Sequence, residues 1–214
     1  MRQTSIGFKS NGLNLEGIVS VPDDSPGPFP TVVICHSHPA LSGNMGNEIV
    51  TAISDSASEH GIASLRFNFR GVGESEGHFS NGEHEIEDLK TALKVARIFP
   101  GLDRNRIGLV GHSFGASIIL RGLKHYKSVN CFVLISPPIS SIDKSKLRKH
   151  KHPKFIAVGD SDRIVDSVEL KQTLGELNEF DQFLEIPGAG HDLQNHEKNL
   201  ASKIITFVVD NFDS

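Results

Sequence analysis

The sequence predicts an α/β protein with a mostly parallel sheet of about eight strands and helices on both faces. Short, continuous apolar runs recur along the chain, which is typical of strands buried on both faces. Between them lie segments whose apolar residues recur every three or four positions, the spacing of one helix face. The first two extended segments are instead joined by Asn11-Gly12, a good signal for an antiparallel hairpin.

The elements follow one another in an alternating order, which favours right-handed crossovers between parallel strands. After the hairpin over 6–21, the expected strands are 31–36, 62–69, 106–111, 131–136, 154–159 and 182–187. The expected helices cover 44–60, a segment from about 81, 116–126 and the end of the chain, where Leu200, Ile204, Phe207 and Val208 share a face. Ser80 and Glu83 have the spacing of a capping box at the start of the second helix.

Composition excludes several classes of protein. The net charge of −4 offers no basic footprint for nucleic acid, and no apolar run approaches the ~18 residues of a membrane span. The first residues lack the apolar core of a signal peptide. We therefore expect one soluble, cytoplasmic domain over 1–214, either monomer or homodimer, in which Cys35 and Cys131 are buried and reduced.

A serine stands between two glycines where a predicted strand meets a predicted helix. The segment Gly111-His112-Ser113-Phe114-Gly115 matches G-x-S-x-G, a sharp strand-to-helix turn. Such a turn projects the serine above the sheet edge, and side chains two positions away on either side would collide. The helix also directs its positive end toward any developing negative charge. These features predict Ser113 as a nucleophile.

A serine hydroxyl needs a base to take its proton, and the candidates follow later strands. His191 follows the strand at 182–187, and Asp162 follows the strand at 154–159. Ligands of parallel sheets bind beyond the carboxyl ends of the strands, so both are expected at the edge where Ser113 lies. His191 would accept the serine proton, and Asp162 would fix its tautomer and stabilise its cation. Asp160, as a turn residue, and Asp166, as a helix-start residue, are the competing carboxylates.

Taken together, these segments resemble the α/β-hydrolase superfamily over nearly the whole chain. The resemblance is to small, lidless, carboxylesterase-like serine hydrolases of the dienelactone hydrolase and serine aminopeptidase-like group. It is carried by the Ser113 turn, by Gly-Asp-Ser-Asp ending at Asp162, by Gly-Ala-Gly-His ending at His191, and by 69–75, which is similar to the loop after the family's fourth strand. The resemblance implies the α/β-hydrolase fold and favours Asp162 as the acid.

Two backbone donors are needed to stabilise a tetrahedral oxyanion. One is the N–H of Phe114, the residue after the nucleophile. The second should come from the loop His36-Ser37-His38-Pro39. Because Pro39 has no N–H, we assign this role to the backbone of His38. The segment departs from the glycine-rich version of this loop and resembles the H-x-H-P segment of some small hydrolases.

Metal and nucleotide binding are not expected. His36 and His38 lack partners at a convincing ligand spacing. The segment 71–77 is not a true dinucleotide fingerprint, and no acidic residue follows it at the required distance. We therefore expect no metal and no dissociable cofactor.

The segment between the strands at 131–136 and 154–159 is short, so any lid is minimal or absent. It contains a group of basic residues, Lys144, Lys146, Arg148, Lys149 and Lys151. These form either a solvated surface or a patch that steers anionic esters toward the site.

The predicted function is that of a serine hydrolase that cleaves small carboxylic esters through an acyl-enzyme. A peptidase or amidase of the same fold is one alternative. A non-catalytic binding protein that retains the fold is another, because fold alone does not establish function. The acyl and alcohol groups of the substrate are left open.

Overall fold

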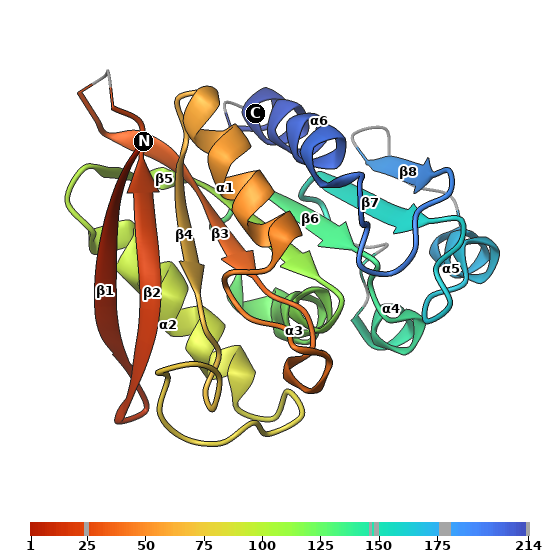
Figure 1. Cartoon of the computed structure of the whole chain (residues 1–214), viewed down its shortest axis with the longest axis horizontal. Coiled ribbons are helices and arrows are strands. Elements are labelled where there is room, and N and C mark those ends of the chain that lie inside the picture. Colours follow the sequence, from red (N-terminus) through yellow and green to blue (C-terminus); the bar gives the residue numbers. More distant parts are fainter. Residues whose placement is uncertain (24–25, 146, 148–149, 176–180, 213–214) are drawn as a thin grey trace.

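A computed structural model of the chain describes residues 1–23, 26–145, 147, 150–175 and 181–212 (Figure 1). Its strands are β1 (Arg2–Ser10), β2 (Leu13–Val21), β3 (Phe29–Cys35), β4 (Ala63–Phe67), β5 (Leu102–His112), β6 (Cys131–Ile135), β7 (Lys154–Gly159) and β8 (Gln182–Ile186). Its α-helices are α1 (Glu48–Glu59), α2 (Glu85–Ile98), α3 (Phe114–Gly122), α4 (Ile139–Ser145), α5 (Ser167–Leu174) and α6 (Glu197–Asp210). Short 3-10 helices cover Pro39–Leu41 (η1) and Leu123–His125 (η2).

The eight strands form one sheet in the order β1-β2-β4-β3-β5-β6-β7-β8. The pairs β1–β2 and β2–β4 are antiparallel, and every pair from β4–β3 to β7–β8 is parallel. The predicted mostly parallel sheet is therefore confirmed. The hairpin is confirmed as well, since Asn11 (φ 48°) and Gly12 (φ 89°) both adopt the positive φ that a tight hairpin turn requires.

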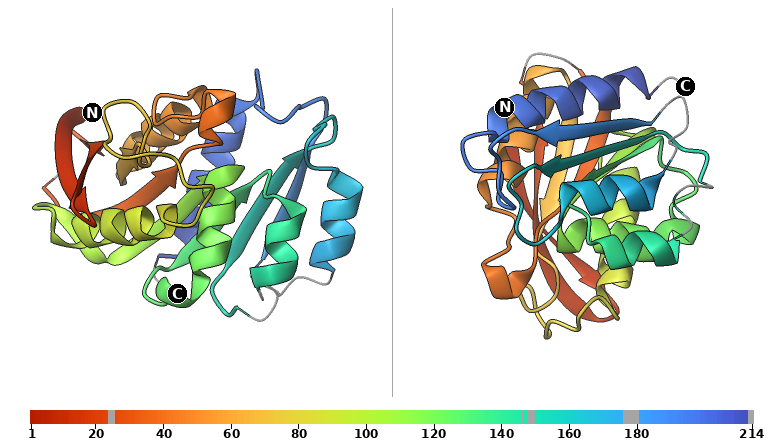
Figure 2. Two further views of the ribbon diagram at one scale, coloured as in Figure 1. Left: turned by 90° about the horizontal axis from the view of Figure 1, so that it is seen from below. Right: turned by 90° about the vertical axis from the view of Figure 1, so that its right-hand side faces the viewer.

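Helices cover both faces of the sheet, as predicted. Helices α1 and α6 lie on one face, and α2, α3, α4 and α5 lie on the other (Figure 2). Successive residues of a strand point to opposite faces, so Val110 of β5 packs into the core beneath α1 and α6. Its neighbour Leu109 packs into the core beneath α2 and α3. Cys35 and Cys131 are buried and free, also as predicted.

The predicted start of α2 is wrong. The helix begins at Glu85 rather than near residue 81, because Asn81 (φ 53°) and Gly82 (φ 83°) adopt backbone angles that a helix cannot contain. The capping-box prediction fails for the same reason. It is Glu85, not Glu83, whose carboxylate accepts hydrogen bonds from the Ser80 and Gly82 N–H groups, at 2.7 and 2.8 Å.

Three loops that matter for chemistry follow the carboxyl ends of β5, β7 and β8. These strands lie on one side of the sheet centre, and their ends point to the same edge (Figure 1). Within the described residues, no helix combines the length and apolar character that crossing a membrane requires.

Candidate active site

Ser113 occupies a strained turn between β5 and α3. Its backbone angles are φ 52° and ψ −107°, which are rarely adopted by a residue that carries a side chain. The two flanking glycines permit this turn. A Cβ at Gly111 would lie 2.6 Å from the nitrogen of Ala116, and one at Gly115 would lie 2.4 Å from the carbonyl oxygen of Cys35. The predicted steric need for glycine on both sides of the serine is therefore confirmed.

The structure brings Ser113, His191 and Asp162 together in one chain of hydrogen bonds. The Nε2 atom of His191 lies 2.8 Å from the Oγ of Ser113. On the other side of the ring, Nδ1 lies 2.9 Å from Oδ2 and 3.1 Å from Oδ1 of Asp162. Only groups delivered by β5, β7 and β8 to a common edge can meet in this way.

Asp162 is held in its ionised form. Burial alone raises the pKa of this carboxyl, but hydrogen bonds from His191 and from the backbone N–H groups of Val165 and Ile164 outweigh it, so the pKa lies below its ordinary value of 3.8. The carboxylate therefore accepts the Nδ1–H of His191. This leaves Nε2 of the neutral ring without a proton and able to accept one from Ser113.

The competing carboxylates have other partners. Asp160 Oδ1 accepts the N–H of Gly188 at 2.8 Å and the hydroxyl of Ser161 at 2.9 Å. Asp166 caps α5 by accepting the N–H of Glu169 at 2.8 Å. Among the three candidates, the geometry places Asp162 against His191.

Two backbone N–H groups near Ser113 have no partner within the described part of the chain. Phe114 is the first residue of α3, where an N–H has no intrahelical acceptor, and no other group of the described residues accepts it. The N–H of His38 is likewise unused, although the carbonyl of His38 accepts from Leu41 and Gly43. A bond of 3.1 Å from Gly115 N–H to the His36 carbonyl holds the two loops together.

Aromatic rings line the side of the site that faces α2 and α3, an arrangement that was not predicted from the sequence. The Phe79 ring lies 5.2 Å from the Phe114 ring, and the His38 ring lies 4.8 Å from Phe79 and 5.4 Å from Phe114. Phe69 packs against Phe114 at 5.6 Å. Phe79 lies in the loop after β4, so no strand or helix periodicity could indicate where its side chain would go.

Two buried histidines next to the site were also missed. His36 donates its Nδ1–H to the Ser37 carbonyl at 2.7 Å, and its Nε2 accepts the N–H of Phe69 at 3.2 Å. His112 donates its Nε2–H to the carbonyl of His191 at 3.0 Å. Burial is the main cause that lowers the pKa of each from 6.5 to about 4, so both rings are neutral near neutral pH. Both histidines therefore hold the loops that carry the site.

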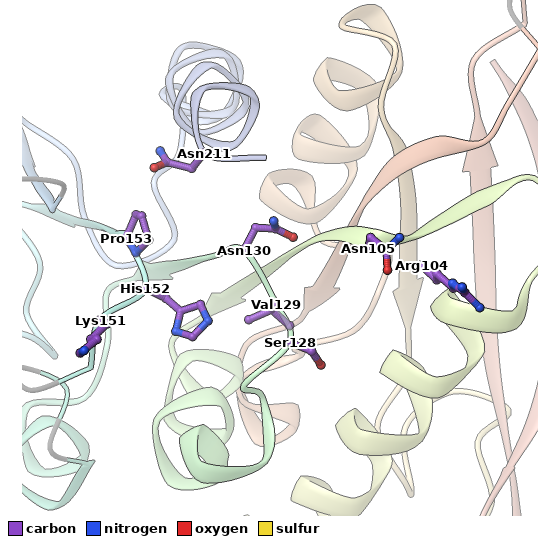
Figure 3. Close-up of a pocket in the computed structure, with 9 residues that line it drawn as sticks. All are labelled: Arg104, Asn105, Ser128, Val129, Asn130, Lys151, His152, Pro153 and Asn211. Carbon is purple, nitrogen blue, oxygen red and sulfur yellow. The ribbon is translucent and has the colours of Figure 1, made fainter. Parts of the chain in front are cut away.

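The predicted basic segment lies largely outside the described structure. Lys146, Arg148 and Lys149 are not among the described residues, and the same holds for the side chain of Lys144. Lys151 lines a cavity of about 680 Å³ together with His152. Figure 3 shows both just before β7, at the amino ends of the strands. The candidate site is at the carboxyl ends, so Lys151 does not flank its mouth.

Comparisons with known proteins show the family and the fold of the chain. A family model described as "Serine aminopeptidase, S33" matches residues 27–151. An uncharacterized protein of Rickettsia prowazekii is 32% identical over 189 residues, which cover 84% of this chain and 79% of that protein. A solved α/β serine hydrolase homologue from Coxiella burnetii is 29% identical, with a TM-score of 0.83 and coverage of 95% and 96% of the two chains. A serine hydrolase without a lid from Xanthomonas campestris is 26% identical, with a TM-score of 0.85 and coverage of 99% and 96%.

Proposed function

Because the chain belongs to the α/β-hydrolase family described as serine aminopeptidase, S33, we propose that it is a serine hydrolase that cleaves small carboxylic esters. The observation that carries the proposal is the continuous hydrogen-bond chain from Asp162 through His191 to Ser113. A serine hydroxyl alone is a weak nucleophile, and this arrangement supplies the base that activates it.

The first half of the reaction acylates the serine. His191 Nε2 takes the hydroxyl proton as the Oγ of Ser113 attacks the ester carbonyl carbon. The negative charge that forms on the carbonyl oxygen is stabilised by the free N–H groups of His38 and Phe114. Asp162 stabilises the imidazolium cation. When the tetrahedral intermediate collapses, His191 returns its proton to the leaving alcohol, and the acyl group remains on Ser113.

The second half releases the acid. A water molecule takes the place of the alcohol, and His191 removes its proton as the oxygen attacks the acyl carbon. The same two N–H groups stabilise the second oxyanion. Collapse of this intermediate breaks the bond to Oγ, and His191 gives the proton back to Ser113. The carboxylic acid leaves, and the starting state is restored.

Two features favour esters over peptides. The segment between β6 and β7, residues 136–153, is short, includes the short helix α4 among its described residues, and leaves little chain to form a lid over a peptide. The similar Xanthomonas campestris protein is itself described as lacking a lid. Beside Ser113, the rings of Phe79 and Phe114 offer an apolar surface that suits a small acyl group. The family description names an aminopeptidase, so amide cleavage is the alternative to test.

A matched ester and amide separate these functions. We expect the purified protein to hydrolyse p-nitrophenyl butyrate at least about a hundredfold faster than the p-nitroanilide of butyric acid, and the Ser113→Ala protein to hydrolyse neither. Comparable rates on the two substrates would support an amidase instead. If the folded protein cleaves neither substrate nor any ester in a series of graded acyl length, a non-catalytic role replaces the proposal.

A further inference from the structure

The side chain of His38 has a free hydrogen-bond donor beside the candidate site. Its Nδ1 atom accepts the N–H of Ala40 at 3.1 Å, so Nδ1 carries no proton and the ring proton is on Nε2. No described residue bonds to Nε2. Nε2 is also not one of the buried side-chain atoms that lack a partner, so it is accessible from solvent. A ligand can therefore reach this donor.

The contacts of the His38 ring fix its orientation. Besides the bond to Ala40, the ring packs edge-on against Phe79, with 4.8 Å between the centroids and 68° between the planes. It packs in the same way against Phe114, at 5.4 Å and 70°. The backbone is held as well, because the His38 carbonyl accepts the N–H of Gly43 at 3.0 Å. A donor that is already held in place loses little freedom when it binds an acceptor, which favours binding.

The ring lies close to the expected place of the acyl group of an ester. The backbone N–H groups of His38 and Phe114 are the proposed oxyanion donors, and they would hold the ester carbonyl next to Ser113. Because His38 supplies both a backbone donor and the ring donor, the first few atoms of the acyl chain would pass near Nε2. The rings of Phe79 and Phe114 form an apolar surface on either side. Nε2–H is thus a polar point beside an otherwise apolar acyl site.

We infer that the acyl group of the substrate carries a keto oxygen on its third or fourth carbon, and that Nε2–H of His38 donates a hydrogen bond to this oxygen. The inference rests on the proposed esterase function and names the class of acyl group that the same site takes. A carboxylate fits less well, because the neighbouring phenyl rings supply no charge that would offset its loss of water. A wholly apolar acyl group would displace water from Nε2–H and leave that donor without a partner.

Shape-matched esters test this inference. We compare kcat/KM for ethyl 4-oxopentanoate and ethyl 4-methylpentanoate, in which a methyl group replaces the keto oxygen, and for the shorter pair ethyl 3-oxobutanoate and ethyl 3-methylbutanoate. Each value is divided by the rate constant for hydrolysis of that ester by hydroxide, which removes differences in intrinsic reactivity. We expect the wild type to prefer the keto ester of at least one pair about fivefold, the effect of one hydrogen bond. Hydrolysis without a preference in either pair overturns the inference and leaves the esterase function standing.

Two substitutions of His38 separate its ring donor from its bond to Ala40. His38→Phe keeps a ring but lacks Nε2–H. His38→Asn keeps an oxygen that can accept the N–H of Ala40, but its side chain ends short of the Nε2 position. Both variants retain the backbone N–H, and we expect both to lose the preference for the keto ester, whatever their overall rates. A wild-type preference in either variant overturns the inference.

A distant histidine provides the matched control. His60 follows the C-terminal end of α1, where its ring bonds the carbonyl of Ser56 at 2.8 Å, so His60→Phe should keep the wild-type preference. An equal loss of preference in His60→Phe would contradict a specific role of His38. If the folded wild type hydrolyses neither these esters nor p-nitrophenyl butyrate, the esterase function fails, and the inference fails with it.

Discussion

The Nε2 atom of His191 lies 2.8 Å from the Oγ of Ser113, although 78 positions separate the two residues in the chain. The parallel strands β5 and β8 bring them together, because each residue stands in the loop that follows its strand. The backbone of Ser113 is strained, because it adopts a positive φ. His191 is held by Asp162, which bonds its Nδ1, and by His112, which donates a hydrogen bond to the carbonyl of His191. These constraints lead to the following predictions.

Replacement of Asp162 by Asn should nearly abolish ester hydrolysis. The amide offers a donor where His191 needs an acceptor, so the ring turns to the tautomer that cannot accept the Ser113 proton. We expect kcat to fall about 10³- to 10⁴-fold, the loss seen when a triad carboxylate is made neutral. Asp160→Asn is the control, because its amide oxygen can still accept the N–H of Gly188. Equal losses in the two variants would argue against Asp162 as the acid.

Replacement of Ser113 by Gly should relieve backbone strain while it removes the nucleophile. A residue with a side chain at φ 52° and ψ −107° costs about 1–3 kcal/mol, and glycine avoids most of this cost. Ser202→Gly, at an exposed position within α6, should instead lower the free energy of unfolding by about 0.5 kcal/mol. Urea unfolding measures the free energy of unfolding of both variants and of the wild type. A Ser113→Gly protein that is less stable than Ser202→Gly would show that the turn is not strained.

The buried ion pair between Arg70 and Asp88 should be important for stability. The Asp88 carboxylate accepts from Arg70 Nη2 at 2.6 Å and Nε at 2.9 Å, and from the Ser10 hydroxyl at 2.7 Å. Asp88→Ala leaves the buried guanidinium without a partner, and we expect a loss of about 3–5 kcal/mol in the free energy of unfolding. Glu87→Ala breaks the partly exposed pair with Lys90 and should cost less than about 1 kcal/mol. Similar losses of stability in Asp88→Ala and Glu87→Ala would contradict the expectation that the Arg70 pair is important for stability.

Stability should fall between pH 6.5 and pH 4 because of His36 and His112. The pKa of each is about 4 in the folded chain, against an ordinary value of 6.5, so the unfolded chain binds more protons in this interval. The stabilisation is complete above pH 6.5 and is lost as the pH falls toward 4, by at most about 3 kcal/mol for each histidine. Asp162 contributes in a lower range, below its ordinary pKa of 3.8.

Urea unfolding of the wild type and His112→Phe between pH 4.5 and 7 measures this effect. We expect the free energy of unfolding to depend less steeply on pH in the variant, by about 1 kcal/mol per pH unit near pH 5.5. His60→Phe is the control, because His60 follows the C-terminal end of α1 and its ring bonds the carbonyl of Ser56 in the same helix. Parallel pH curves for wild type and His112→Phe would mean that the His112 ring titrates normally in the folded chain.

The sequence indicated the succession of strands along the chain and the loops of the site, because apolar runs and glycine spacing report directly on backbone geometry. At Gly111 and Gly115 a side chain would collide with the nearby backbone, and the G-x-S-x-G spacing indicates this requirement in the sequence. The start of α2 was mispredicted because the backbone of Asn81 and Gly82 overrides the spacing of Ser80 and Glu83. The catalytic roles of Ser113, Asp162 and His191, and the oxyanion roles of His38 and Phe114, stay predictions.

The surroundings of the site were not readable from the sequence. The burial of His36 and His112 depends on how three loops pack, and a histidine at or just after the end of a strand carries no sign of its exposure. The contact between Phe79 and Phe114 joins the loop after β4 to the first residue of α3, so no local pattern encodes it.

Covalent labelling with a fluorophosphonate tests the central claim most directly. An activated serine attacks the phosphorus atom and displaces fluoride, so the intact mass rises by one phosphonyl group. We expect one adduct per chain, located on Ser113 by peptide mapping, no adduct in Ser113→Ala, and much slower labelling in His191→Gln. A folded wild-type protein that stays unlabelled, or one labelled as fast without His191 as with it, would contradict the claim that His191 activates Ser113.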